Sequence, residues 1–147
     1  PMPVFQRRGA AYPMLRYPWT EVRAALEALA SDDPALDAVQ VAYVNPETGA
    51  DAQNVLGYSA LMLRPGQTLR LPARSPASVF HLIEGSVDVS IEATAPQAFR
   101  LAEADTCCAP GYAAITLTNA ATDRPSFLFI ADESPLHRKL GIYEMRG

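Results

Sequence analysis

The sequence predicts an all-β domain, a small antiparallel barrel, preceded by one helix and an extended arm. Most of the chain after residue 37 consists of short β-rich runs separated by Pro, Gly, Asn and Asp, which is typical of a β-sandwich or barrel. In one of these runs Val87, Val89 and Ile91 alternate with polar residues, as on a strand with one buried and one solvated face. A chain of 147 residues suits one structural domain with its own core.

Residues 1–37 are expected to form an arm and a helix that pack on a barrel made by residues 38–147. Residues 1–19 contain four prolines, and proline neither continues a helix nor donates to a β-ladder. We therefore expect an extended arm. Its apolar anchors would be Tyr12, Tyr17 and Trp19.

An amphipathic helix is predicted over residues 21–30, with Thr20 as its N-cap. Apolar residues recur there with i, i+3, i+4, i+7 spacing, which gathers them on one helix face. The run Ser-Asp-Asp-Pro that follows, residues 31–34, is a helix stop signal.

The β-rich runs give the expected strands of the barrel. In chain order they are residues 38–44, 56–63, 69–71, 78–83, 87–92, 98–101, 106–109, 114–118 and 127–131. A last helical turn is expected over residues 136–140, with a closing strand or tail over residues 141–145.

Composition excludes several classes of function. The net charge of -4 and the pI of about 5.1 argue against nucleic acid or an anionic membrane as the main partner. The sequence has no run of 18 apolar residues, so no membrane span is expected, and no secretory signal is expected at its start. The adjacent Cys107 and Cys108 would point to opposite faces of a strand, so we expect reduced thiols and a cytoplasmic location.

Two stretches resemble the paired motifs of the cupin family, whose fold is a small β-barrel. The first family motif runs Gly, five residues, His-x-His, three or four residues, Glu, six residues, Gly. Here Gly66 and Gly85 take the glycine positions with the required spacing. The metal-ligand positions of that motif fall on Pro72, Arg74 and Ser78.

The second family motif has a match between residues 110 and 119. Pro110, Tyr112 and Asn119 fit its pattern, whereas its histidine position is taken by Ile115. The resemblance thus retains the motif residues that shape turns and loses every residue that would hold a metal.

Four stretches, considered together, indicate which group of cupin proteins the chain resembles most. Residues 17–19, 43–49, 78–85 and 128–141 are jointly similar to the C-terminal half of gentisate 1,2-dioxygenases and of the related salicylate and 1-hydroxy-2-naphthoate dioxygenases. Those enzymes have two cupin domains. The resemblance implies Fe(II) held by three histidines, O₂-dependent ring cleavage of a hydroxylated aromatic acid and, in many members, a working site in the N-terminal cupin.

Ring cleavage of this kind needs three protein ligands and open coordination positions on the metal. The chain has only two histidines, His81 and His137. If Ser78 points into the barrel, period-2 alternation turns His81 outward. His137 follows the last barrel strand. We interpret both histidines as surface or interface residues.

The residues at the ligand positions also argue against a metal. Pro72, Ser78 and Ile115 are poor ligands, and the guanidinium of Arg74 has no lone pair to donate. The sequence therefore predicts no catalytic residue, no metal and no cofactor in this chain. The first hypothesis is a metal-free, non-catalytic half of a gentisate dioxygenase-like protein that serves scaffolding or assembly.

Two other functions stay open. Arg74 could clamp a carboxylate in a pocket shared with Ser78, Tyr112 and Ile115, which would make the chain a binding module for a small aromatic carboxylate. The more ordinary role for Arg74 is an ion pair at the barrel rim. The last hypothesis is an active dioxygenase with a non-standard site that uses His81 or His137.

The expected partners are further copies of the chain or an N-terminal catalytic cupin domain. The aromatic arm could lie across a partner barrel or cover its own barrel, and the sequence favours neither.

Overall fold

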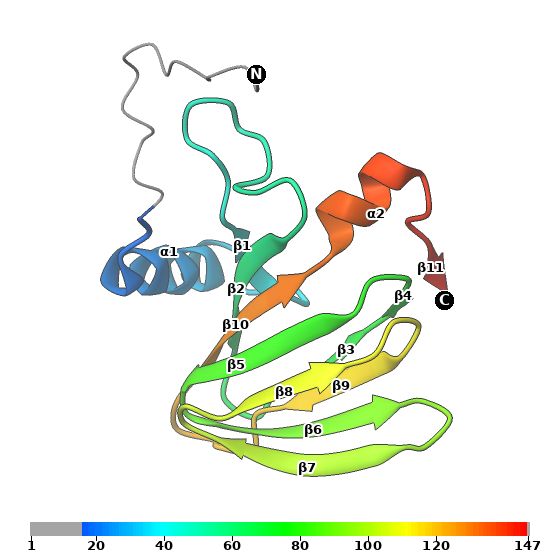
Figure 1. Cartoon of the computed structure of the whole chain (residues 1–147). Helices are drawn as coiled ribbons and strands as arrows, with labels where there is room; N and C mark the ends of the chain where they lie inside the picture. The colour runs from blue at the N-terminus through cyan, green and yellow to red at the C-terminus, as the bar shows by residue number, and fades with distance from the viewer. Residues whose placement is uncertain (1–15, 147) are drawn as a thin grey trace, which may run out of the picture.

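The computed structural model describes residues 16–146, and it consists mainly of two antiparallel β-sheets that face each other (Figure 1). The five-stranded sheet has the order β1 (Val39–Ala42), β2 (Gly57–Leu63), β10 (Ser126–Asp132), β5 (Ser78–Glu84) and β8 (Thr106–Ala109). The four-stranded sheet has the order β3 (Thr68–Leu71), β9 (Ala114–Thr118), β6 (Ser86–Glu92) and β7 (Gln97–Ala102). The remaining elements are α1 (Trp19–Asp32), α2 (Ser134–Leu140) and the pair β4 (Ala73–Arg74) with β11 (Met145–Arg146).

The predicted all-β fold with an N-terminal helix is confirmed. Every predicted helix and barrel strand is present, with ends that differ by at most two residues from the prediction. The prediction missed β4, which is only two residues long and lies in a proline-containing stretch without a β-rich pattern.

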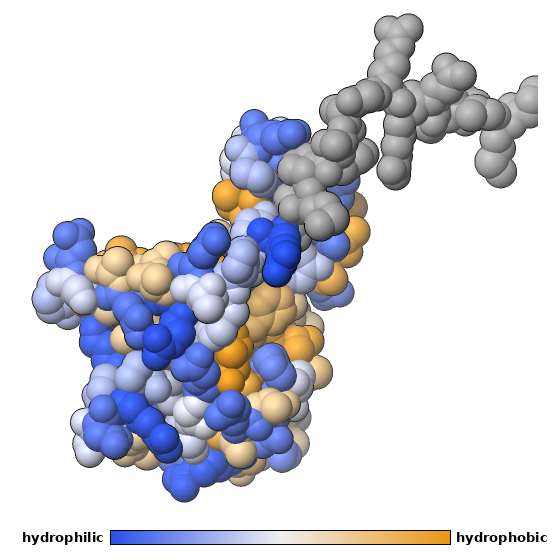
Figure 2. Space-filling model, turned by 90° about the vertical axis from the view of Figure 1, so that its left-hand side faces the viewer, coloured by the Kyte–Doolittle hydropathy of each residue, from blue (hydrophilic) through white to orange (hydrophobic). Residues whose placement is uncertain are grey.

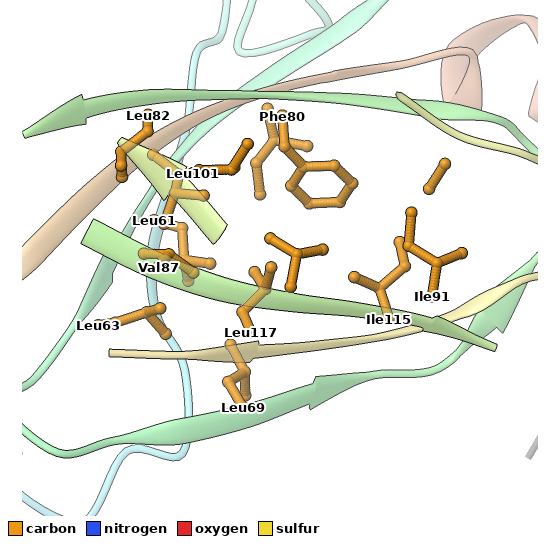
Figure 3. Packing of buried hydrophobic residues seen from close by; sticks show 14 of the residues in the cluster. Leu61, Leu63, Leu69, Phe80, Leu82, Val87, Ile91, Leu101, Ile115 and Leu117 are labelled. Carbon is orange, nitrogen blue, oxygen red and sulfur yellow. The ribbon is translucent and has the colours of Figure 1, made fainter. Parts of the chain in front are cut away.

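The main core lies between the two sheets, where apolar side chains from both sheets point toward one another (Figure 3). Phe80 and Leu82 of β5 are fully buried there, as is Leu117 of β9 on the opposite sheet. The alternating strand β6 contributes Val87 and Ile91, as its sequence pattern indicates. The interior of the barrel is therefore filled with hydrocarbon.

A second, smaller core lies on the outer face of the five-stranded sheet, beneath α1. Val22 and Leu26 of α1 pack there against Ala60, Met62 and Phe127. Strand β2 is thus buried on both faces, which explains its nearly continuous apolar sequence.

The start of α1 differs from the prediction. The helix begins at Trp19 after Pro18, and no side chain caps it, so the expected Thr20 N-cap is wrong. The indole Nε1 of Trp19 donates to Glu84 at 2.8 Å, and Arg23 Nε donates to the other oxygen of that carboxylate at 3.2 Å. These contacts to the end of β5 stabilise the first helical turn without a side-chain cap.

The described part of the arm lies on its own barrel. The ring of Tyr17 packs edge-on against Tyr43 at 4.8 Å, and its hydroxyl donates to the carbonyl of Val44. Trp19 packs edge-on against Phe127 at 5.5 Å. The third expected anchor, Tyr12, lies outside the described residues.

The surface is mostly hydrophilic. Figure 2 shows one face, on which polar and charged residues dominate and apolar residues form smaller areas between them. Among residues 16–146, neither helix has the length and apolar character needed to cross a bilayer.

Gly85 joins β5 to β6 with a φ of +100°, and it has no room for a side chain. A Cβ at this position would lie 2.9 Å from Ser126 Cβ on the neighbouring strand β10. Gly66 also has a positive φ, of +70°, but no atom lies within 4 Å of the point that a Cβ would occupy there. A side chain at Gly66 would therefore meet backbone strain alone, whereas one at Gly85 would meet backbone strain and a steric clash.

We predict that Gly85→Ala destabilises the fold much more than Gly66→Ala does. Left-handed backbone strain should lower the free energy of unfolding by about 1–2 kcal/mol at either position. The clash at Gly85 should add about 1–3 kcal/mol. Urea unfolding of the two variants checks this, and equal losses would contradict the tight packing of Gly85 on Ser126.

Candidate functional site

The candidate pocket residue Arg74 lies on the short strand β4 and is already paired. Its Nη2 lies 3.2 Å from Oδ2 of Asp132 and donates to Ser78 Oγ at 3.3 Å. Both partners of the ion pair are largely shielded, with side-chain exposures of 25% for Arg74 and 14% for Asp132. The other oxygen of Asp132 accepts from the backbone N–H of Ser134, which fixes the carboxylate beside the guanidinium.

Arg74 contacts two of the other three candidate pocket residues, Ser78 through its side chain and Tyr112 through a backbone hydrogen bond from the Tyr112 N–H to the Arg74 carbonyl. Arg74 and Ser78 meet through the hydrogen bond just described. Ile115 is only 5% exposed, belongs to the apolar core and lies opposite Ile91 in the β6–β9 pairing.

Tyr112, the fourth candidate, turns toward the C-terminal segment. Its hydroxyl donates to Glu144 Oε2 at 3.0 Å, and the guanidinium of Arg146 lies 4.2 Å from the centre of its ring. The hydrogen bond to Glu144 raises the pKa of the Tyr112 hydroxyl. Tyr112 is 43% exposed, so it contacts residues of the C-terminal segment while part of its surface stays accessible.

His81 points away from the barrel core, as the alternation predicts. Its neighbours Phe80 and Leu82 are fully buried in the core, and its own Nδ1 shares a hydrogen bond of 2.9 Å with Thr106 Oγ1. His81 therefore lies on the outer face of the five-stranded sheet.

His137 is more enclosed than a surface histidine. Its side chain is 16% exposed, its Nδ1 shares a hydrogen bond of 2.9 Å with Ser75 Oγ, and its Nε2 lies 3.9 Å from Glu133. His137 is thus partly enclosed, because α2 packs its inner side on the loop that contains Ser75, and its place at an interface stays a prediction.

The residues at the family's ligand positions do not fit iron. Pro72 is exposed, Arg74 is engaged with Asp132, Ser78 is engaged with Arg74, and Ile115 is part of the apolar core. Within residues 16–146, no three or more His, Cys, Asp and Glu side chains are grouped so that they could hold a metal ion.

The adjacent cysteines are free thiols on opposite sides of β8. Cys108 is exposed, whereas Cys107 is half-buried and packs against the main core. Burial raises the pKa of the Cys107 thiol to about 11, with a further contribution from Cys108. Cys107 is therefore protonated near neutral pH and is not an activated nucleophile.

The retained residue of the second motif, Asn119, has a structural role. It is fully buried, and its Nδ2 donates to the carbonyls of Leu63, Arg64 and Arg124 at 2.9–3.3 Å. Its Oδ1 accepts from the N–H of Ala121. Asn119 thus joins the end of β2 to the loop that precedes β10.

Sequence reasoning missed a hollow of about 490 Å³ on the outer face of the five-stranded sheet. We call it the aromatic groove, and its main lining residues are Tyr17, Trp19, Tyr43, Tyr58, His81 and Phe129. The sequence did carry one signal for this groove. Phe129 lies between Leu128 and Ile130, which face the core, so strand alternation turns this aromatic side chain to the outer face. The groove carries aromatic surface and few polar atoms, and it is separate from Arg74.

No family model matches the chain. It is 64% identical over 147 residues to a gentisate 1,2-dioxygenase of Ralstonia sp., a match that covers 100% of this chain and 41% of that protein. The chain is a homologue of the gentisate 1,2-dioxygenases. It is also 30% identical over 135 residues to a 5-aminosalicylate 1,2-dioxygenase of Comamonas sp., covering 90% of this chain and 35% of that protein.

Solved structures support the cupin fold of this gentisate dioxygenase homologue. A salicylate 1,2-dioxygenase of Pseudoaminobacter salicylatoxidans superposes with a TM-score of 0.78 at 22% identity, over 88% of this chain and 36% of that one. A cupin domain of Schizosaccharomyces pombe Cnp3 gives a TM-score of 0.55 at 13% identity, over 74% of this chain and 72% of that one. The chain spans about two fifths of the length of the dioxygenases it matches.

We predict that benzoate does not stabilise the chain through Arg74. A free carboxylate would have to displace Asp132, which is tethered to the same barrel and therefore has a high effective concentration. Thermal melting with and without benzoate checks this. A benzoate-dependent rise in Tm that is lost in Arg74→Ala would contradict the account and favour the carboxylate-binding module.

Proposed function

We propose that this chain is the metal-free, non-catalytic cupin half of a gentisate 1,2-dioxygenase-like protein. Its barrel serves as a scaffold for assembly and for the shape of a catalytic cupin elsewhere in the same polypeptide. The observation that carries the proposal concerns the three histidine positions of the family motifs. They hold the exposed Pro72, the ion-paired Arg74 and the core residue Ile115, and none of these supplies an imidazole.

The contrast between lost and retained motif residues supports the scaffold role. Gly85 allows β5 and β10 to approach closely, and the buried Asn119 donates to three backbone carbonyls, so both residues are needed by the fold itself. Arg74 and Ile115 are equally integrated, one through an ion pair and the other through core packing, and neither side chain offers a ligand atom to a metal. A barrel that retains these structural residues can keep the fold even when its metal-ligand positions are replaced.

The length of the relatives supports the rest of the proposal. Since the chain corresponds to 41% of the Ralstonia dioxygenase, the larger part of such a protein lies outside it. That part would carry the Fe(II) site and the ring-cleaving activity on a hydroxylated aromatic acid, which belongs to aromatic compound catabolism. We further propose a homo-oligomeric assembly and a cytoplasmic location, with which the two free cysteines are compatible.

We predict that the isolated chain, supplied anaerobically with Fe(II), shows no gentisate-dependent O₂ uptake above a protein-free control. The physical reason is that no set of three ligand side chains converges within residues 16–146. An oxygen electrode provides the measurement, with the full-length Ralstonia dioxygenase as the positive control. Stoichiometric gentisate turnover by the isolated chain would overturn the proposal.

A further inference from the structure

The connection between β1 and β2, residues 45–56, buries no side chain and is positioned by polar contacts. None of its residues is buried, and none belongs to either apolar core. Its tip folds on itself, where the N–H groups of Asn45 and Gly49 donate to the carbonyls of Ala50 and Asn45, each at 2.8 Å. A segment without buried apolar side chains opens at a small cost in free energy, so the contacts at its edges decide where it lies.

Two cationic side chains of α2 reach this connection. Arg138 Nη2 lies 2.9 Å from both carboxylate oxygens of Asp51. Lys139 Nζ donates to the side-chain oxygen of Asn54 at 2.5 Å and to its carbonyl at 3.2 Å. Figure 1 shows the connection beside α2, beyond the ends of the strands. Residues 45–56 are thus held at one edge by the positive charge of α2.

Helix α2 gives these cations a fixed support, because its inner side is anchored. Pro135 is fully buried, and a Cβ on Gly57 would come within 3.2 Å of its ring. One turn further on, His137 Nδ1 shares its hydrogen bond with Ser75 Oγ. We therefore expect the connection to move before the helix does.

The same connection forms part of the wall of the aromatic groove. Ala52 and Gln53 line the groove, and the hydroxyl of Tyr58, another lining residue, donates to Gln53 Oε1 at 2.8 Å. The two lining residues lie between Asp51 and Asn54 in the sequence, which are the residues that α2 contacts. Displacement of the connection would therefore remove this wall.

We propose that residues 45–56 form a strap that Arg138 and Lys139 hold against α2, and that its release opens the aromatic groove on this side. The ion pair of the strap is exposed, with side-chain exposures of 50% for Arg138 and 39% for Asp51, and exposed pairs stabilise little. Salt screens such a pair, so a rise in ionic strength shifts the strap toward its open state. The strap is independent of the scaffold role, because it needs only contacts within this chain.

Native-state proteolysis with thermolysin measures the population of the open strap, because cleavage between Asn54 and Val55 requires the segment to leave the barrel. Arg138→Gln should raise the cleavage rate about two- to fivefold, the factor expected for the loss of one exposed ion pair, with an almost unchanged Tm. The matched control is Arg100→Gln, which removes the exposed pair with Asp88 from the four-stranded sheet and should leave the rate unchanged. An unchanged rate in Arg138→Gln would overturn the proposal.

Salt gives a second readout. Raising NaCl from about 0.05 M to about 1 M should speed cleavage of the parent chain but not of Arg138→Gln. A peptide with the sequence of residues 45–58 corrects for the effect of salt on the protease itself. An equal effect of salt on both chains, after this correction, would contradict an ion pair that holds the strap.

The groove itself supplies the third readout. In the chain cleaved between Asn54 and Val55, hydroxyl-radical oxidation of Tyr58 should rise several-fold relative to Tyr112, which is 43% exposed and lies outside the groove. Unchanged oxidation of Tyr58 would show that the strap does not wall the groove. Faster cleavage of Arg138→Gln together with an equal loss of global stability would make the strap part of the cooperative barrel and would also overturn the proposal. None of these results bears on the scaffold role, which iron binding tests.

Discussion

The apolar packing between the two sheets is the constraint on which the rest of this structure depends. Side chains such as Phe80, Leu117 and Ile115 fill the space between the sheets. An unpaired imidazole in place of Ile115 would lose this packing and cost about 1–3 kcal/mol or more for the buried polar group. Hydrocarbon at this position therefore suits the packing between the sheets better than a histidine would.

The ion pair between Arg74 and Asp132 is the polar counterpart of this packing, because it occupies another of the family's ligand positions. The guanidinium of Arg74 is permanently charged and would repel a divalent cation. Asp132, a residue of the same chain, neutralises this charge. The pair also joins β4 to the end of β10, beside the start of α2. Removing one partner would leave a shielded charge, which is why the two positions are expected to act as a unit.

The sequence allowed most of the fold to be predicted because period-2 alternation and turn residues mark strands directly. Strand β6 illustrates this, since its apolar and polar residues separate cleanly onto two faces. The start of α1 was placed wrongly because local capping rules favour Thr20, whereas tertiary contacts of Trp19 with Glu84 and Phe127 decide it. The enclosure of His137 likewise depends on where α2 packs, which no local pattern reveals.

The candidate site was predictable only in part, for a related reason. Motif spacing located Arg74, Ser78 and Ile115, but it could not say that the first two contact each other while the third joins the core. The aromatic groove combines residues from the arm, β2, β5 and β10, so it exists only after the sheet has formed. Sites assembled from outward-facing residues of several strands are not visible in any single stretch.

The central claim is that this barrel keeps the cupin fold without a metal, and iron stoichiometry tests it most directly. The purified chain would be incubated anaerobically with Fe(II), desalted and analysed for iron per polypeptide. The account predicts a value near zero, unchanged in His81→Ala and His137→Ala. A value close to one iron per chain that falls in either variant would contradict it.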